Sequence, residues 1–454
     1  MIRFGFLWGF ALLYHQLGYG VALASPLDAA LTATAVAAML RPGSVPVLGA
    51  LAAFHVGAVF QHLPAVYNHW YFAALVSLAL LMAAGSVVWQ TLRSPAPRAP
   101  LAQYFPGAFF PAARVSLLLV YLLSGFHKLN RDFFSPEVSC ATTLYGRLSE
   151  RLGGLPAGPA LLALIIVLTL AIELGVPVLL MLPRLRGAGV VIALLFHVVL
   201  ALAGYPRFSA TGVALLTLFL PEHPEFGQSE LGRVGAKAWA ALAAPVTRAL
   251  LVAGLAVGVA VGPVASEFLL LAAQLFLAAA VVAAALALLP VPAMSKPLAG
   301  AAAPRHWQAA MLAPVLVLAS GLTPYLGLGT DRAFSMYSNL RTEDGRPNHF
   351  LIPSSIQVFG YQRDLVQVIE SNTPRLNYLA RRRLLVPYAE FRAIISEAPS
   401  AERDVAVTFV RRGERHVIPA ARRDSSLAVP VPLPALKWLR FRPIEPAGKR
   451  QCTV

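Results

Sequence analysis

A hydrophobic run that begins at Tyr121, YLLSGFHKLNRDFFSPEVSC, ends in polar residues that could carry out acid–base chemistry. His127 and Lys128 are adjacent, and Gly125 just before them permits another backbone to approach closely. A lysine in a partly desolvated pocket can hold a neutral amine, which is then available as a general base. A lysine at the end of an apolar helix also commonly extends to lipid headgroups, so the stretch needs further polar residues beside it to be a reaction centre.

Such residues are expected at the same membrane level. His69 follows Asn68 at the start of one apolar segment, and His197 lies near the end of another. Arg207 lies in the turn after that second segment, and Glu173 lies deep in an apolar segment. Ionisable residues at such depth usually face a bundle interior or a cavity, pair with one another and mark function.

Each of these residues also has a purely structural explanation. His69 alone is explained as an interfacial side chain, His197 as a hydrogen-bonded core histidine, and Arg207 as an anchor at the membrane surface. The expected gathering of His69, Lys128 and His197 near one leaflet, on three segments, favours a shared site. A neutral imidazole there could position a substrate or stabilise a developing negative charge.

The remaining motifs exclude several kinds of catalysis. The sequence has no HExxH zinc pattern, no GxSxG nucleophile turn and no phosphate-binding loop. We therefore expect a base that works without a metal or a nucleotide. A base at the outer leaflet suits a lipid-soluble acidic substrate, for example a hydroquinone.

The composition predicts an all-α polytopic membrane bundle. Hydrophobic residues make up 57% of the chain and charged residues only 13%, whereas soluble domains carry about a quarter charged residues. About eleven transmembrane helices are expected, some of them shorter than the roughly 20 residues of a full span. The apolar segments lie at 4–24, 27–40, 46–62, 69–90, 110–127, 158–182, 188–204, 208–221, 246–264, 267–290 and 307–327.

The charges of the connections orient these segments. If every segment crosses, basic residues from Arg3 and Arg41 to Lys296 and Arg305 fall on one side, which the positive-inside rule makes cytoplasmic. The N-terminus is then cytoplasmic, and the ends of the segments that carry His69 and Lys128 face the opposite side. In a multi-pass protein of a bacterial inner membrane, that side is the periplasm.

The chain becomes soluble in character after about residue 328. We expect a transmembrane domain at 1–328 and a small periplasmic α+β domain at 329–454, with a hairpin around Arg411–Glu414. Of the net charge of +16, half comes from residues 331–454, which hold 20 Lys and Arg against 12 Asp and Glu. No nucleic-acid motif accompanies this charge, so contact with anionic lipid headgroups or an acidic polypeptide explains it better. The polar segment Phe334–Phe350 joins the two parts, as a loop over the site or as a hydrogen-bonded linker.

The two cysteines, Cys140 and Cys452, both fall on the predicted outer side. A disulfide would persist there, but two unpaired thiols fit the sequence equally well. Two cysteines supply neither a cysteine-based zinc site nor a CxxC redox motif.

The residues around Lys128 resemble the vitamin K-dependent γ-carboxylase superfamily, in particular its bacterial proteins with an HTTM (horizontally transferred transmembrane) domain. SGFHKLNRDFF is similar to the family's Gly-x-x-Lys-Leu segment, and YNHW, which holds Asn68 and His69, is similar to its Asn-His segment. The resemblance covers the chain to about residue 290, and more loosely the rest.

The resemblance implies an enzyme that deprotonates reduced vitamin K, a menaquinol-type quinol, and couples its oxygenation and epoxidation with O2 to carboxylation by CO2. It implies Lys128 as the base, His69 as its helper, and His197 as a further histidine of the site. We expect Asn68, His127 and Arg207 to contact the substrate, with no metal.

The tail differs from the large lumenal domain with which animal members of that family bind a propeptide, so the acceptor, which could be a polypeptide, stays open. Two alternatives remain. The first is a non-enzymatic membrane protein that binds a quinone or lipid. The second is a transporter with Glu173 and His197 on an ion path, which ranks last because the sequence shows no inverted repeat.

Overall fold

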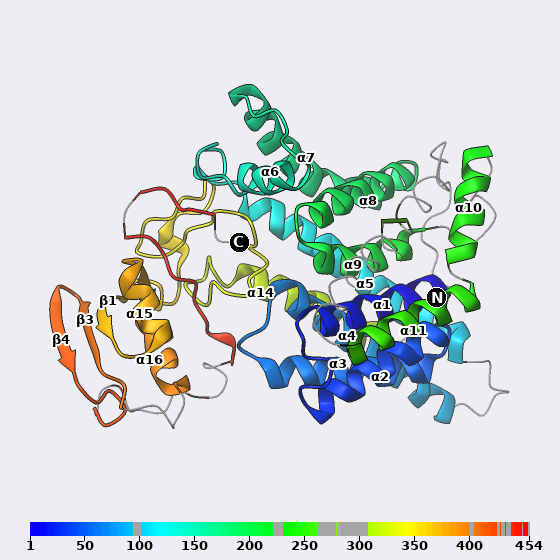
Figure 1. Ribbon diagram of the computed structural model, residues 1–454, viewed down its shortest axis with the longest axis horizontal. Helices are drawn as coiled ribbons and strands as arrows, with labels where there is room; N and C mark the ends of the chain where they lie inside the picture. The colour runs from blue at the N-terminus through cyan, green and yellow to red at the C-terminus, as the bar shows by residue number, and fades with distance from the viewer. Residues whose placement is uncertain are drawn as a thin grey trace.

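The computed structural model describes residues 1–93, 101–220, 230–242, 244–261, 278–279, 281, 307–398, 404–424, 427, 432, 437–446 and 448–452. Across these residues the chain is mostly helical and carries one small antiparallel sheet. Figure 1 shows a helical bundle with the sheet and its two helices set beside one end of it.

The helices of the bundle follow the apolar segments of the sequence. They are α1 (Ile2–Gly18), α2 (Pro26–Leu40), α3 (Val45–His62), α4 (Asn68–Arg93), α5 (Leu101–His127), α6 (Cys140–Arg151), α7 (Pro159–Met181), α8 (Arg186–Leu202), α9 (Pro206–Leu216) with the short η1 (Thr217–Phe219), α10 (Glu230–Leu242), α11 (Pro245–Val261), α13 (Trp307–Ala310) and α14 (Leu312–Leu322).

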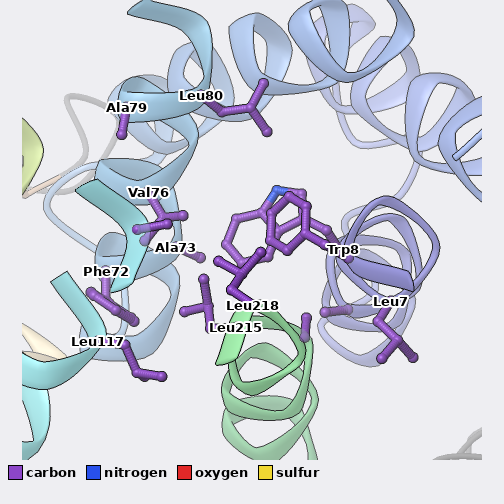
Figure 2. Packing of buried hydrophobic residues seen from close by; sticks show 14 of the residues in the cluster. Leu7, Trp8, Phe72, Ala73, Val76, Ala79, Leu80, Leu117, Leu215 and Leu218 are labelled. Atoms are coloured by element: carbon purple, nitrogen blue, oxygen red, sulfur yellow. The ribbon is translucent and has the colours of Figure 1, made fainter. Parts of the chain in front are cut away.

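Helix α1 forms the centre of the bundle. Every residue from Phe4 to Gln16 is buried, so this helix is apolar on all sides and lacks a single packing face. Gly9 lets it cross α2 closely, because a Cβ there would lie 2.8 Å from the carbonyl oxygen of Ala35. Trp8 reaches from α1 toward α4 and the end of α9, among the buried residues that Figure 2 shows.

The predicted apolar segments form helices over most of their described residues, although α1 ends at Gly18 and α14 at Leu322, before the predicted ends. The predicted count of eleven crossings is not confirmed. In the described part of the chain, four helices are long and apolar enough to cross a membrane, namely α3, α4, α5 and α7. A bent pair formed by α10 and α11 would make a fifth. Helices α2, α8 and α14 are apolar but shorter, and the segment 267–290 lies almost wholly outside the described residues.

A long segment, residues 330–363, packs against the end of α5 just after Lys128, and its one described helix is the short η2 (Ser354–Ile356). The backbone of Asn130 pairs with that of His349, and the Phe350 amide donates to the Leu129 carbonyl at 2.9 Å. The Asn130 side-chain amide donates to the Ser338 carbonyl at 2.6 Å. These bonds fix the polypeptide on both sides of Lys128.

The same segment contains unusual backbone conformations. Arg332, Phe334, Tyr337, Asn339 and Asp344 all have positive φ angles between 53° and 62°. Non-glycine residues in this region cost about 1–3 kcal/mol each and persist only where their surroundings hold them in place. Here a dense set of hydrogen bonds does so, and such strain is common next to functional sites.

The small sheet lies in the C-terminal part of the chain. Its strands are β1 (Leu365–Ser371), β2 (Leu385–Pro387), β3 (Val407–Arg411) and β4 (Glu414–Ile418), in the antiparallel order β2-β1-β3-β4. The β3–β4 hairpin turns at the predicted position. Helices α15 (Pro374–Arg381) and α16 (Tyr388–Glu397) pack on the sheet, and their apolar residues form a core separate from that of the bundle.

A buried ion-pair cluster joins the end of the chain to this domain. The Arg440 guanidinium donates to Glu390 at 2.7 and 2.8 Å and also contacts Glu397. Arg440 and Glu390 are both almost fully buried. Hydrogen bonds to these carboxylates raise the pKa of Arg440 against the opposing effect of its burial, so the charged pair holds residues 437–446 against α16.

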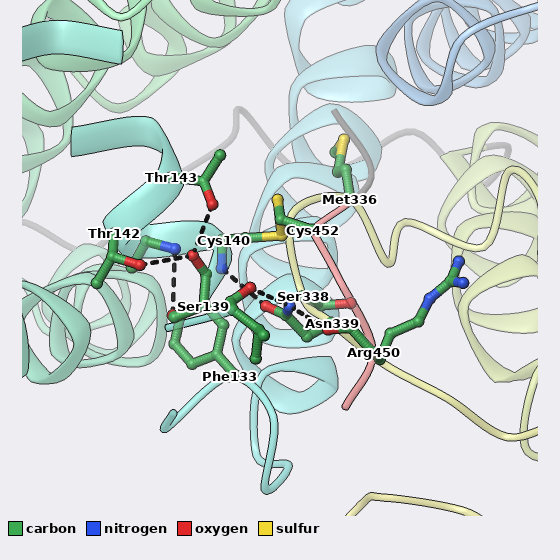
Figure 3. Close-up of a disulfide and its surroundings, with 12 residues drawn as sticks. Phe133, Ser139, Cys140, Thr142, Thr143, Met336, Ser338, Asn339, Arg450 and Cys452 are labelled. Atoms are coloured by element: carbon green, nitrogen blue, oxygen red, sulfur yellow. Dashed lines mark hydrogen bonds between the residues drawn. A yellow bond between two sulfur atoms is a disulfide. The ribbon is translucent and has the colours of Figure 1, made fainter. Parts of the chain in front are cut away.

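The chain's two cysteines form a disulfide, which decides between the two possibilities that the sequence leaves open. Cys140 at the start of α6 bonds Cys452 near the end of the chain. Figure 3 shows Asn339 beside this bond. Its side chain accepts from the Cys140 amide at 2.8 Å and donates to the Arg450 carbonyl at 2.8 Å. The disulfide therefore fastens the last residues to α6 and to the segment after Lys128.

We predict that Cys452→Ser lowers the thermal unfolding temperature of the purified protein. Loss of a native disulfide typically costs about 2–5 kcal/mol. In the wild-type protein, alkylating reagents should label neither cysteine before reduction. Gln451→Ser at the exposed neighbouring position is the matched control and should unfold like the wild type. Labelling of both cysteines without reductant would contradict the disulfide.

Candidate functional site

Gly125 brings α5 and α7 into contact at the level of the candidate base. A Cβ atom at this position would lie 2.6 Å from Leu174 Cδ2 and 3.4 Å from Glu173 Cβ. The expectation that Gly125 permits close approach is therefore confirmed, and the element that approaches is α7. This contact places Glu173 opposite Lys128, one turn further along α5.

Lys128 lies inside the protein at the end of α5, where it is 2% exposed. Its Nζ lies 2.7 Å from Glu173 Oε2 and donates to Ser124 Oγ at 2.9 Å. The Met336 carbonyl lies 3.4 Å from Nζ on the other side. The lysine thus has a buried counter-ion, whereas the sequence analysis expected an uncharged amine without one.

The contact between the two charged groups is close but poorly aligned. Glu173 Oε2 has no hydrogen-bond partner of good geometry although it lies 2.7 Å from Nζ. We therefore describe the contact as an ion pair. Taking both charges out of water is costly, and each compensates the other only while both are present.

The pair forms part of the wall of a cavity of about 480 Å³. The cavity lies between α5, α7, α8 and α9 and is covered by α6 and by Met336 and Tyr337 of the segment 330–363. Most of its lining is aliphatic or aromatic, with a few polar groups that include Lys128 and Glu173. Small-molecule sites in proteins commonly have this volume and this distribution of polarity.

His197 lines the same cavity from α8. Its Nε2 shares a hydrogen bond of 2.9 Å with the Tyr121 hydroxyl, which lies two turns before Lys128 on α5. Its Nδ1 is buried and has no hydrogen-bond partner. Gly212 on α9 makes room for the ring, because a Cβ atom there would lie 2.3 Å from His197 Nε2.

His69 lies in a neighbouring aromatic cluster and is not among the residues that line the cavity. Its ring centroid lies 5.3 Å from that of His15 and 6.4 Å from that of Phe208. Phe208 also contacts His197, at 5.4 Å between ring centroids, and it lines the cavity. The two histidines thus contact the same phenylalanine. His69 Nε2 is buried without a hydrogen-bond partner.

The other three predicted substrate contacts bind the protein itself. Asn68 accepts from the Phe334 amide at 3.0 Å. His127 shares a hydrogen bond of 2.7 Å with the Tyr325 hydroxyl and bonds the Ala333 carbonyl. Arg207 donates to the Gly18 carbonyl and lies over the ring of Tyr19. None of the three lines the cavity, so the structure gives each a role in holding the segments around it.

Tyr337 covers the cavity from outside the helices. Its ring packs on that of Tyr205 with 4.7 Å between the centroids. Burial is the main cause that raises the pKa of Tyr337, followed by the neighbouring Tyr205. The hydroxyl therefore stays protonated at neutral pH and can donate a hydrogen bond. The polar segment that holds Tyr337 is both the loop over the site and the hydrogen-bonded linker.

Several site residues were not predicted as such from the sequence. Tyr121 and Ser124 precede Lys128 by seven and four residues, so helical spacing alone places all three on one face of α5. Glu173 was recognised as an ionisable residue at depth, but nothing in the sequence identified its partner. Among the described residues, no group of three His, Cys, Asp or Glu side chains could hold a metal ion.

Residues 50–222 match the family model of the HTTM domain. That segment contains Lys128, Glu173 and His197 and most of the helices around the cavity. No curated protein and no solved structure matches the chain. The match covers less than half of the chain, so this segment is similar to an HTTM domain, and together with the long apolar helices it supports a membrane protein.

Proposed function

We propose that this protein is an integral membrane enzyme in which Lys128 deprotonates a reduced quinone, whose oxygenation drives the carboxylation of an acceptor. One observation carries the proposal. The Lys128 amine lies buried beside Glu173 in the wall of a largely apolar cavity of about 480 Å³. The HTTM domain supports the same class of reaction.

A quinol of the vitamin K type fits the cavity. Its aromatic ring would lie against Phe72, Phe196 and other apolar lining residues. Its hydroxyl groups would form hydrogen bonds with the few polar side chains of the lining, among them Lys128 and His197. A cavity of this size takes a ring with a short substituent, which is the reactive part of such a molecule.

The Lys128–Glu173 pair supplies the base. In the resting pair, one proton is shared between an amine and a carboxylate. Exclusion of water by the bound quinol disfavours the two separate charges, so that the proton passes to Glu173 and the amine becomes neutral. Lys128 then accepts the hydroxyl proton of the quinol, and Glu173 keeps its own. The pair therefore gains one proton in all.

His197 stabilises the negative charge that develops on the quinol oxygen. The Tyr121 hydroxyl fixes the orientation of the imidazole through its hydrogen bond at Nε2. Nδ1 has no protein partner and is free to interact with a ligand. His69 contacts Phe208, which in turn contacts His197, and it influences the site through the packing of that ring.

The overall chemistry balances without a metal. A quinol and O2 give the quinone epoxide and water, so the quinol is oxidised and each oxygen atom is accounted for. Oxygenation of the quinol anion gives a strongly basic alkoxide, which takes a proton from a carbon atom of the acceptor and leaves as the epoxide and water. The resulting carbanion adds CO2 and becomes a carboxylate. The basic C-terminal domain at 329–454 is suited to present a polypeptide acceptor to the site, which we place on the periplasmic side of an inner membrane, opposite a cytoplasmic N-terminus.

A quinone- or lipid-binding protein without catalysis is the second candidate. The apolar cavity alone would serve that function, since binding needs no proton transfer. A buried ion pair in the cavity wall favours catalysis, because burying two charges is costly and the binding of an apolar ligand does not need them. A transporter remains the least favoured possibility.

Lys128→Ala should abolish quinone epoxide formation in membranes supplied with reduced vitamin K and O2. A positioned general base contributes roughly 10²–10⁴-fold to the rate, so a fall of this size is expected. Binding of the quinone without turnover by the wild-type protein would favour the second candidate instead. Undiminished epoxide formation by the variant would remove Lys128 from the mechanism.

A double variant separates loss of the base from loss of the fold. Lys128→Met alone leaves a buried carboxylate without its partner, which typically costs about 3–5 kcal/mol. Lys128→Met combined with Glu173→Leu replaces the pair with apolar side chains and should restore the unfolding temperature. We expect both variants to be inactive. Activity in the stable double variant would show that the pair is not the base.

Glu173→Gln should also reduce the rate strongly, because the amide cannot take the proton that Lys128 must lose. Glu173→Asp keeps a carboxylate and should recover part of the activity, whereas Glu173→Leu should not. The measurement is the initial rate of epoxide formation at saturating quinol. Equal rates for the Gln and Asp variants would contradict a role in proton transfer.

Gly212→Ala should reduce activity by displacing His197 from Tyr121. The added methyl group would lie 2.3 Å from the ring, so the ring must move. Gly85→Ala on α4 is the control, since a Cβ atom there meets nothing within 4 Å. Wild-type activity of Gly212→Ala in a folded protein would mean that the orientation of His197 is unimportant.

A further inference from the structure

We propose that the apolar tail of the substrate leaves the cavity sideways, through an opening between α7 and α8 beneath α6. This inference rests on the proposed function, and it names the substrate as a quinol with a long hydrocarbon side chain. It also assigns a second part of the binding site, separate from the polar groups that meet the ring.

Helices α7 and α8 approach each other closely at the end where they are joined. Gly189 lies against α7 there, since its Cβ atom would come within 2.9 Å of Leu179 Cβ and 3.1 Å of the Leu180 amide nitrogen. The Arg186 guanidinium donates to the Leu180 carbonyl at 3.1 Å in the same region. Toward their other ends the two helices are separated by the cavity, which residues of both line.

The wall of the cavity between these helices is open to the outside. Leu168 on α7 and Ile192, Leu195 and Val199 on α8 all line the cavity, yet they are 48%, 36%, 55% and 47% exposed. A side chain that lines a cavity and is also this exposed marks the edge of an opening. All four side chains are aliphatic, so the edge is suited to contact with hydrocarbon.

The polar side chain at the opening is already hydrogen-bonded within its own helix. Thr169 is a polar residue on the α7 side, and its hydroxyl donates to the Ile165 carbonyl of its own helix at 2.8 Å. This bond satisfies the hydroxyl within the helix. A charged or strongly polar ligand would therefore gain no hydrogen bond from Thr169 to replace those it makes with water. A hydrocarbon chain makes no hydrogen bonds with water, so it has none to replace.

Helix α6 lies across the cavity near this opening and has two different faces. Leu144, Tyr145 and Leu148 line the cavity at helical spacing. Arg147 on the other face is exposed and donates to the Tyr205 hydroxyl. An amphipathic helix of this kind lies at the boundary between headgroups and hydrocarbon, which puts the opening just inside the bilayer.

A long hydrocarbon tail does not fit inside the cavity, so part of it must lie outside. About 480 Å³ accommodates a ring with a short substituent but no extended polyprenyl chain. With the ring held at Lys128 and Glu173, the tail points to the aliphatic edge formed by Leu168 and Leu195. The site therefore fits a molecule with a polar ring at one end and a hydrocarbon chain at the other.

The first test narrows the opening. Leu168→Trp should lower the rate with a long-tailed quinol by roughly tenfold or more relative to its effect on the rate with the same ring lacking a tail. Leu164→Trp is the matched control, because Leu164 is 50% exposed on the same helix but does not line the cavity. An equal effect of Leu168→Trp on both quinols would overturn the opening as the exit of the tail.

A second test measures binding and requires no turnover. The chain's two cysteines are joined to each other, so L168C supplies a single reactive thiol. A long-tailed quinone should slow the alkylation of L168C, while the ring without a tail should not. L164C should show no protection by either compound. Protection of L168C by phospholipid as strong as by the quinone would overturn the quinol tail as the occupant.

The two tests distinguish failure of this inference from failure of the proposed function. Absence of turnover with every quinol, together with specific protection of L168C, would overturn the enzymatic proposal and support the tail site. Turnover that depends on Lys128, together with unprotected L168C, would support the enzyme and overturn the tail site.

Discussion

The close approach of α5 to α7 at Gly125 is the constraint on which the site depends. Without that approach Lys128 and Glu173 would each be a single charge in an apolar region, and neither could remain buried at acceptable cost. Together they form one pair 2.7 Å apart in the wall of the apolar cavity. In the proposed mechanism this pair takes up the proton of the quinol.

The surroundings of this pair are held in two ways. The segment 330–363 covers it with Met336 and Tyr337, and the positive φ of Tyr337 is maintained by the hydrogen bonds of its neighbours. The disulfide fastens the end of the chain to the start of α6. Backbone strain of the kind found in this segment is common next to functional sites.

The sequence predicted helical segments and a lysine inside the protein much better than it predicted the partners of that lysine. Apolar composition locates helices such as α4 and α7, but it cannot distinguish a membrane span from a helix buried on all sides, as α1 shows. For that reason the number of crossings is not confirmed. Helix α6 was missed, because its exposed arginines and glutamate interrupt the apolar pattern.

Helical spacing alone predicts that the side chains of Tyr121, Ser124 and Lys128 lie on the same face, because it determines the direction in which each side chain of one helix points. It says nothing about which helices are neighbours, so the partnership of Lys128 with Glu173 had to come from the structure. The same limit explains why His69 was expected beside the lysine. The two residues lie near the start and the end of their helices, but His69 contacts Phe208, which lines the cavity, and does not line the cavity itself.

The central claim is that the Lys128–Glu173 pair takes up the proton of the quinol. The most direct measurement is the infrared difference spectrum of the purified protein on addition of reduced quinone without oxygen. The account predicts a new band of a protonated carboxylic acid, which Glu173→Gln abolishes. Formation of the quinol anion in the wild-type protein without such a band would contradict it.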